Sequence, residues 1–424
     1  MATSKCGCLR KSGPLPHPES PHEALDRVFR SAHGRITAAL VRCFGCNQLP
    51  SIENVIQEAG VRALERWHKE TLPRDPESWL LRVAHNLFID SLKRERRNSA
   101  IEAGDITVAP LECDVDDELR LIFLCCHPEL TPAAQIALTL RIAYGFSAAQ
   151  IARAFLSDER TVAQRIVRAK QRIRDLGCRF EVPEADELPL RLDSILRVLY
   201  QIFAEGYAPT ADESGINEEL CNESLRLVRL LSQDPRTSSP ETEALRSLFC
   251  FQHSRAPARL ASDGSLLLLH EQDRTLWAKD LIAEGFQFLA RGARGEQATR
   301  FHCEAGIAAC HALAKTYAST DWVQIVSLYE LLRVCARSPV VEVNRAFAIA
   351  MCRGATAGLD ELDAIPERDF LARYPYALAA YSELHASLGQ FDVARTYLDR
   401  AIVCQTSPAE SRLLKRKRTA LQGL

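Results

Sequence analysis

Guanidinium and carboxamide groups recur at helical spacing on one short segment of the chain, over residues 159–174. They belong to Arg160, Gln164, Arg165, Arg168 and Arg172. Groups of this kind match the edges of guanine and adenine where a helix enters the major groove, and the later arginines match phosphates. The segment therefore predicts a helix that binds DNA. The alternative is a solvated basic face in an ordinary helical bundle.

A helix-turn-helix within residues 131–174 is predicted to hold these groups in place. Gly145 interrupts the preceding helix, Ser147 can cap the next one, and residues 156–158 form the turn. The basic helix then opens at Glu159. Its apolar residues recur at i, i+4, i+7 and i+11 and are expected to face a core: they are Val162, Ile166, Ala169 and Ile173.

A second basic surface is predicted upstream, on a helix that runs from Pro76 to about Arg97. Asp75 can cap this helix, and proline is favoured at a first helical position. One side of the helix is apolar and the other is polar and mostly positive. The polar side carries Asn86, Asp90, Lys93, Arg94 and Arg97.

A further amphipathic helix is predicted to begin near Ser51 and Glu53 and to reach Trp67. Its apolar residues repeat with helical period and are expected to be buried. Its exposed side includes Gln57 and Glu58. A surface of this composition suits a protein partner, whereas the helix that follows it suits nucleic acid.

Three segments, taken in order, resemble conserved regions 2 and 4 of bacterial sigma factors of the extracytoplasmic-function type. They are IENVIQEAGVRALERW at 52–67, PESWLLRVAHNLFIDSLKRERR at 76–97, and the helix-turn-helix. The resemblance implies that the first region binds core RNA polymerase and opens the minus-ten promoter element. It implies that the later region recognises the minus-thirty-five element. The partners would be promoter DNA and core polymerase, through its β′ clamp and β flap.

The same resemblance implies roles for individual residues. Gln57 and Glu58 would contact the polymerase. The melted minus-ten strand would meet Asn86, Asp90, Lys93, Arg94 and Arg97. The minus-thirty-five element would meet Arg160, Thr161, Gln164, Arg165 and Arg168. Many relatives carry a glycine in the turn of the helix-turn-helix, where this chain has Leu-Ser-Asp at 156–158.

The resemblance in this form covers about the first 180 residues, and the chain continues well beyond them. It therefore resembles the subgroup with a large helical C-terminal extension, on two strings: DDELRLIFLCCHPEL at 116–130 and IFAEGY at 202–207. The chemistry of these strings does not predict their function. The extension is expected to be helical apart from a short strand at 265–269. Gly354 and Gly389 open two similar segments 35 positions apart, a spacing that resembles tetratricopeptide repeats.

The predicted fold class is therefore all-α, with two small helical sigma domains followed by a helical-repeat domain. Stacked helix pairs present a concave groove, so a peptide or protein ligand and regulation of the sigma domains are both expected. The predicted ranges are a disordered tail at 1–20, region 2 at 21–97, a linker at 98–115, region 4 at 116–178, a second linker at 179–189 and the extension at 190–424.

Composition agrees with a globular chain of several domains. The 424 residues are 47% hydrophobic with a formal charge of −2, so acidic residues elsewhere balance the basic helices. No apolar stretch approaches the roughly 20 residues that span a bilayer, and the N-terminus lacks an export signal. A cytoplasmic location without membrane contact is expected.

Metal, redox and enzymatic chemistry are not predicted. The chain holds 15 cysteines, an odd number, but no pair of CxxC motifs at zinc-finger spacing. The candidate groups for metal or redox chemistry are Cys6 with Cys8, Cys43 with Cys46, the run 125–127, and residues 302–303 with 310–311. Phosphate-loop, His-Glu-x-x-His and Gly-x-Ser-x-Gly motifs are absent, so neither a cofactor nor catalytic residues are expected.

Two functions remain open from the sequence. The first is a promoter-specificity subunit of RNA polymerase that is governed by its own C-terminal helices. The second is a helix-turn-helix regulator with a repeat-type sensor domain, which binds operators without joining polymerase. The segment 52–67 favours the first, because an ordinary regulator has no use for it.

Overall fold

Helices make up the regular structure of the chain. The computed structural model describes residues 21–67, 72–98, 115–210, 215–261, 263–295, 297–405 and 407–422. Within these ranges the only β-pairing is an isolated bridge between Leu260 and Leu266, so the predicted all-α class is confirmed. The predicted tail at 1–20 and the linker interior at 99–114 lie outside the described residues. No helix in the described ranges has the length and apolar character needed to cross a bilayer.

The predicted strand at 265–269 is wrong. The chain pairs with Leu260 at one position and then turns, because side chains capture the backbone groups that a ladder would use. Gln272 Nε2 donates to the Leu267 carbonyl (3.1 Å), and the Leu268 N–H donates to the Glu271 carboxylate (2.7 Å).

Three helices and a short 3-10 turn form the first bundle. They are α1 (Pro21–Phe44), η1 (Cys46–Gln48), α2 (Leu49–Trp67) and α3 (Pro76–Asn98). Helix α3 begins as predicted, since the Asp75 carboxylate accepts the Ser78 N–H at 3.0 Å. Its apolar side packs into the core through Leu80, Ala84 and Leu87.

Four helices form the helix-turn-helix part: α4 (Val115–Cys125), α5 (Pro132–Ile142), α6 (Ala148–Ala154) and α7 (Glu159–Asp175). Ser147 and Gln150 form a reciprocal capping box at the start of α6, which confirms the predicted cap. The four apolar residues predicted to face inward on α7 are all buried: Val162, Ile166, Ala169 and Ile173.

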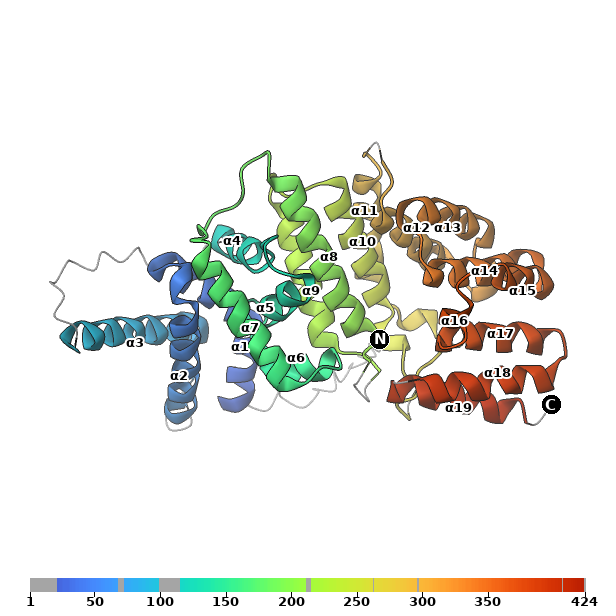
Figure 1. Ribbon diagram of the computed structural model, residues 1–424, viewed down its shortest axis with the longest axis horizontal. Coiled ribbons are helices and arrows are strands. Elements are labelled where there is room, and N and C mark those ends of the chain that lie inside the picture. The colour runs from blue at the N-terminus through green and yellow to red at the C-terminus, as the bar shows by residue number, and fades with distance from the viewer. Residues whose placement is uncertain are drawn as a thin grey trace, which may run out of the picture.

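The first half of the extension packs directly on these helices. It comprises α8 (Leu188–Tyr207), α9 (Glu218–Gln233), α10 (Pro240–Ser254), η2 (Ala256–Ala258), η3 (Arg274–Leu276), α11 (Lys279–Gly292) and α12 (Arg300–Leu313). A single cluster of buried apolar side chains runs from Val28 in α1 to Ala309 in α12. Figure 1 shows α8 beside α4 and α5, which it contacts, and α9 also contacts α4. The predicted ranges for the sigma regions and the extension thus share one core.

The second half of the extension consists of stacked helices: η4 (Tyr317–Ser319), α13 (Trp322–Ala336), α14 (Pro339–Arg353), α15 (Ala355–Asp363), α16 (Arg368–Leu371), α17 (Pro375–Ser387), α18 (Phe391–Cys404) and α19 (Pro408–Ala420). The repeat predicted from Gly354 and Gly389 corresponds to the pairs α14–α15 and α17–α18, which lie one beside the other in Figure 1. Both glycines adopt positive φ, 94° and 76°, in the turns that join the paired helices.

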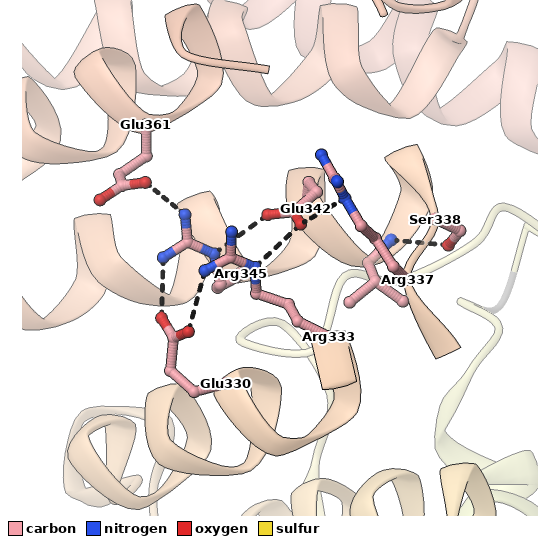
Figure 2. A network of polar contacts seen from close by, with 8 residues as sticks. Glu330, Arg333, Arg337, Ser338, Glu342, Arg345 and Glu361 are labelled. Atoms are coloured by element: carbon pink, nitrogen blue, oxygen red, sulfur yellow. Dashed lines mark hydrogen bonds and ion pairs between the residues drawn. The ribbon is translucent and has the colours of Figure 1, made fainter. Parts of the chain in front are cut away.

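A network of charges, with Arg345 and Glu342 buried at its centre, connects α13, α14 and α15 (Figure 2). Arg345 on α14 binds Glu330 at 2.9 Å and also contacts Glu342 and Glu361. Glu342 in turn accepts from Arg333 at 2.9 Å. Because Arg345 and Glu342 are both buried, each needs the other's charge, and the network fixes how the three helices stack.

The acidic start of α4 gives a physical role to the string at 116–130. Three consecutive carboxylates bind three arginines from different elements. The pairs are Asp116 with Arg236 after α9 (2.8 Å), Asp117 with Arg42 of α1 (3.0 Å), and Glu118 with Arg226 of α9 (2.6 Å). Helix α4 therefore joins the first bundle to the extension.

Candidate nucleic-acid interface

The outward face of α7 carries free positive charge. Arg160, Thr161, Gln164 and Arg168 are exposed, and Arg165 is half-buried. Among the residues that the structure describes, Arg160, Arg165 and Arg168 have neither an ion pair nor a hydrogen bond from the guanidinium. Arg172, one turn further on, binds Glu129 at 2.6 Å. The charge predicted to meet DNA is thus concentrated in the first three turns of the helix.

Thr161 differs from its neighbours because it belongs to the cap. Asp158 accepts both its N–H (3.0 Å) and its hydroxyl (3.4 Å). The contact fixes the first turn of α7 and with it the direction of the basic face.

The turn before α7 contains Leu156 in a left-handed conformation, with φ of 45°. It is the one non-glycine residue with positive φ in the described ranges. Its side chain is 59% exposed and contributes little packing. The backbone at Leu156 is therefore strained, because a left-handed conformation costs a residue with a Cβ about 1–2 kcal/mol.

Replacing Leu156 by glycine is therefore expected to raise the free energy of unfolding by about 0.5–1 kcal/mol, after the entropy that glycine loses on folding. Urea unfolding followed by circular dichroism measures the change. Leu190→Gly is the matched control, because Leu190 is 68% exposed but lies in helix α8, so glycine should destabilise there. Loss of stability in both variants would show that the Leu156 turn is unstrained.

The surfaces predicted on α2 and α3 are exposed. Gln57 and Glu58 face solvent, and Glu58 forms an i,i+4 ion pair with Arg62 at 2.7 Å. Asn86, Asp90, Lys93 and Arg94 are exposed along α3, where Arg94 Nε donates to the Asp90 carbonyl at 3.3 Å. The side chain of Arg97 lies outside the described residues.

Glu53 is a residue whose role the sequence did not reveal. It is 6% exposed and forms ion pairs with Arg141 of α5 and Lys170 of α7. Helix α2, which carries Gln57 one turn later, is thereby held against the helix-turn-helix. A carboxylate next to Ile52, on the apolar side of an amphipathic helix, was the available signal, because a buried acid requires a cationic partner.

The residues of the string at 202–207 lie at the end of α8 and contact neighbouring elements. Glu205 accepts the Thr210 N–H (2.9 Å) and hydroxyl (3.0 Å), and Thr210 Oγ1 also lies 3.1 Å from the Ala154 carbonyl that ends α6. Burial raises the pKa of Glu205 to about 6. A side chain at Gly206 would lie 2.7 Å from Leu220, so glycine permits close packing of α8 on α9. The string therefore attaches the extension to the helix-turn-helix.

Six of the described cysteines are buried, whereas Cys335 and Cys352 are exposed, and burial sets the chemistry of the buried thiols. It raises the pKa of the Cys46 thiol to about 11, of Cys126 to about 12 and of Cys303 to about 11, which disfavours the reactive thiolate. No group of three His, Cys, Asp or Glu residues arranged to hold a metal occurs in the described ranges, and Cys6 and Cys8 lie outside them. His127 accepts the Glu129 N–H at 3.2 Å, in the turn after α4.

Three family models match the chain in succession. Residues 28–98 match sigma-70 region 2, residues 120–173 match sigma-70, region 4, and residues 191–293 match a family of unknown function, DUF6596. The first two matches cover the helices that carry the exposed residues of α2, α3 and α7.

Relatives match either most of the chain or a shorter stretch of it. An uncharacterized protein of Rhizobium meliloti (strain 1021) is 37% identical over 403 residues, which cover 92% of this chain and 94% of the relative. The probable ECF RNA polymerase sigma factor SigI of Mycobacterium tuberculosis, in two strains, is 27% identical over 167 residues, or 37% of this chain and 56% of the relative. No solved structure matches the chain significantly.

Proposed function

Since the chain belongs to the sigma-70-like RNA polymerase sigma factors of the extracytoplasmic-function type, with a C-terminal extension, we propose that it binds core polymerase, directs promoter-specific initiation and is regulated by its C-terminal helices. The observation that carries the proposal is an exposed polar face on α2, at Gln57 and Glu58, together with a basic face on α7 whose first arginines have no ion pair among the described residues. An operator-binding regulator needs only the second.

Each face has a proposed task. Gln57 and Glu58 dock on the β′ clamp, and the helix-turn-helix part contacts the β flap. Asn86, Asp90, Lys93, Arg94 and Arg97 capture the opened minus-ten strand by backbone charge and stacking. The minus-thirty-five element is read by Arg160, Thr161, Gln164, Arg165 and Arg168. A protein with these tasks acts in the cytoplasm, where the chromosome lies.

The sigma regions must move apart to bind both promoter elements at once, because helices of the two regions are in contact in this structure. Promoter elements about 25 base pairs apart lie on the order of 80 Å apart on B-form DNA, at about 3.4 Å per base pair. Glu53 instead holds α2 in contact with α5 and α7. We infer that polymerase binding separates these helices and that the extension, tied to α4 through Arg226 and Arg236, sets how readily they separate. A protein or peptide bound on the stacked helix pairs could then act as the signal.

Reconstitution of the full chain with core RNA polymerase, followed by mapping of transcription starts on genomic DNA, tests the proposal. Specific starts are expected. The double variant Gln57→Ala and Glu58→Ala should weaken core binding at least tenfold, whereas Gln201→Ala, an exposed glutamine on α8, should not change it. Failure of the unaltered chain to bind core polymerase would contradict the proposal and leave the operator-binding regulator.

Arg165→Ala tests the assignment of the α7 face. If its guanidinium reads a base, the variant should lose about 1–3 kcal/mol of promoter binding and tolerate every base at one position. Binding is measured on promoter duplexes substituted at each position, at fixed salt. Arg174→Ala, exposed in the last turn of α7, is the control. An equal loss on all duplexes would make Arg165 a phosphate contact.

A further inference from the structure

A cavity of about 570 Å³ lies where the two halves of the extension meet. Tyr207 and Ala208 line it from the end of α8, and Leu266–Leu269 from the segment after η2. Tyr376 of α17 and Glu410 of α19 line the opposite side. The segment after α10, yellow in Figure 1, is fixed to α19 because Arg416 binds Ser265 (3.0 Å) and Glu271 (2.7 Å). The volume suits a small organic molecule.

Positive charge and an unused donor meet on one side of this cavity. Arg259 is only 9% exposed, and its guanidinium carbon lies 3.8 Å from the centre of the Tyr207 ring. Arg255 lies next to it and has only two long hydrogen bonds, each of 3.3 Å, to the amide oxygens of Gln252 and Gln272. The buried hydroxyl of Tyr207 has no hydrogen-bond partner among the described residues.

Glu410, a carboxylate that lines the cavity, attracts Arg259 electrostatically but forms no ion pair with it. Neither Arg255 nor Arg259 forms an ion pair with any residue that the structure describes. Glu410 instead accepts from the Tyr376 hydroxyl and from Gln405 Nε2, and Lys417 is paired with Glu383 at 2.6 Å. Burial of guanidinium groups without a counter-charge is unfavourable, and a bound anion would supply that charge.

We propose that this cavity binds a small organic anion, a carboxylate or phosphate attached to an apolar body. Arg259 and Arg255 would bind the anionic group, and the Tyr207 hydroxyl would donate to one of its oxygens. The apolar body would contact the remaining wall, formed by Leu266, Leu267, Ala379, Leu413 and Leu414.

The site is connected to the helix-turn-helix by a short stretch of chain. Tyr207 lies between Glu205 and Thr210, and Thr210 bonds the end of α6. A ligand that repositions Tyr207 therefore acts on the contact that holds α6. Through this coupling the anion would act as a signal for the proposed sigma function, so the coupling rests on that proposed function. Binding of the anion to the cavity does not depend on it.

Binding is tested with the full chain and four probes that share one apolar body: octanoate, octyl phosphate, octanol and octylamine. Octanoate and octyl phosphate are expected to raise the melting temperature by several degrees in a saturable manner, and the alcohol and the amine are not. Titration calorimetry should show at least tenfold weaker octanoate binding to Arg259→Gln. Arg291→Gln is the control, since Arg291 also stacks on an aromatic ring, 4.6 Å from the centre of Phe288, but lies outside the cavity.

A second variant allows the proposal to be tested even where Arg259→Gln does not fold. Ala379→Phe fills the cavity from α17 without changing charge and should also abolish binding. Equal stabilisation by all four probes would overturn the proposal, and so would unchanged octanoate binding to either variant. Binding of a tetraleucine peptide with a free C-terminal carboxylate, but of neither anionic probe, would assign the cavity to peptides instead.

Hydrogen–deuterium exchange tests the coupling without polymerase. Octanoate is expected to change exchange at residues 148–158 in the unaltered chain but not in Arg259→Gln. Unchanged exchange there, with octanoate bound, would overturn the connection to the helix-turn-helix.

Discussion

Glu118→Gln is expected to lower the free energy of unfolding by about 3 kcal/mol, because it leaves the guanidinium of Arg226 without its main counter-charge. The side chain of Glu118 is 4% exposed and that of Arg226 is 29% exposed, at an N···O distance of 2.6 Å. Arg226 keeps a second partner in Glu223 (2.8 Å), which places the effect at the lower end for a broken buried pair. Glutamine preserves the volume of the side chain, so the loss of stability results from the lost charge and not from a cavity.

Glu129→Gln is the matched control. Glu129 and Arg172 also lie 2.6 Å apart, but their side chains are 52% and 48% exposed. Solvent screens such a pair, so the urea midpoint of this variant should not change measurably. Equal midpoints for the Glu118 and Glu129 variants would show that α4 does not depend on its link to α9.

Local rules were enough to predict the elements that position the proposed interface. Asp75 and Ser147 cap helices because each can accept an N–H within its own first turn. The buried side of α7 follows from a repeat of 3.6 residues. These signals lie within a few residues of one another, so the sequence alone carries them.

Contacts between distant residues could not be predicted in the same way. Glu53 is 88 positions from Arg141, and Glu118 is 108 positions from Arg226. A sequence of 55 acidic and 53 basic side chains offers many alternative pairs. The predicted strand at 265–269 was wrong for a different reason: the side chains of Glu271 and Gln272 bind backbone groups only three and five positions away, in place of a neighbouring strand.

Length predicted several domains, yet one apolar cluster extends from α1 to α12. The reason lies in α4, where Leu119, Leu121, Ile122 and Phe123 are all fully buried. From Leu121 to Cys125 every residue of α4 is apolar and buried, so this part of the helix must be covered on every side. Helix α1 covers one side of α4, and α8 and α9 of the extension cover others.

Truncation after Arg179 is therefore expected to leave no stably folded chain. The cut removes α8 and α9 and exposes one side of α4, together with Tyr144, which is 3% exposed and bonds Ser224 of α9 at 3.1 Å. Exposure of about four large apolar side chains costs about 6–12 kcal/mol, at about 1.5–3 kcal/mol each. That cost is comparable to the whole stability of an ordinary domain. Analytical ultracentrifugation and near-ultraviolet circular dichroism of the fragment measure the outcome.

Truncation after Lys315 provides the comparison. This cut keeps α1–α12 and their shared core, and it removes α13–α19, whose buried residues form other clusters, one of which includes Cys303 of α12. The longer fragment should be monomeric and unfold cooperatively. If the shorter fragment were equally well folded, the core shared with the extension would be dispensable, and the extension would be a separate module as its length first indicated. If only the longer one folds, the first half of the extension is part of the sigma fold, and it is the direct connection between the stacked helices beyond it and the sigma regions.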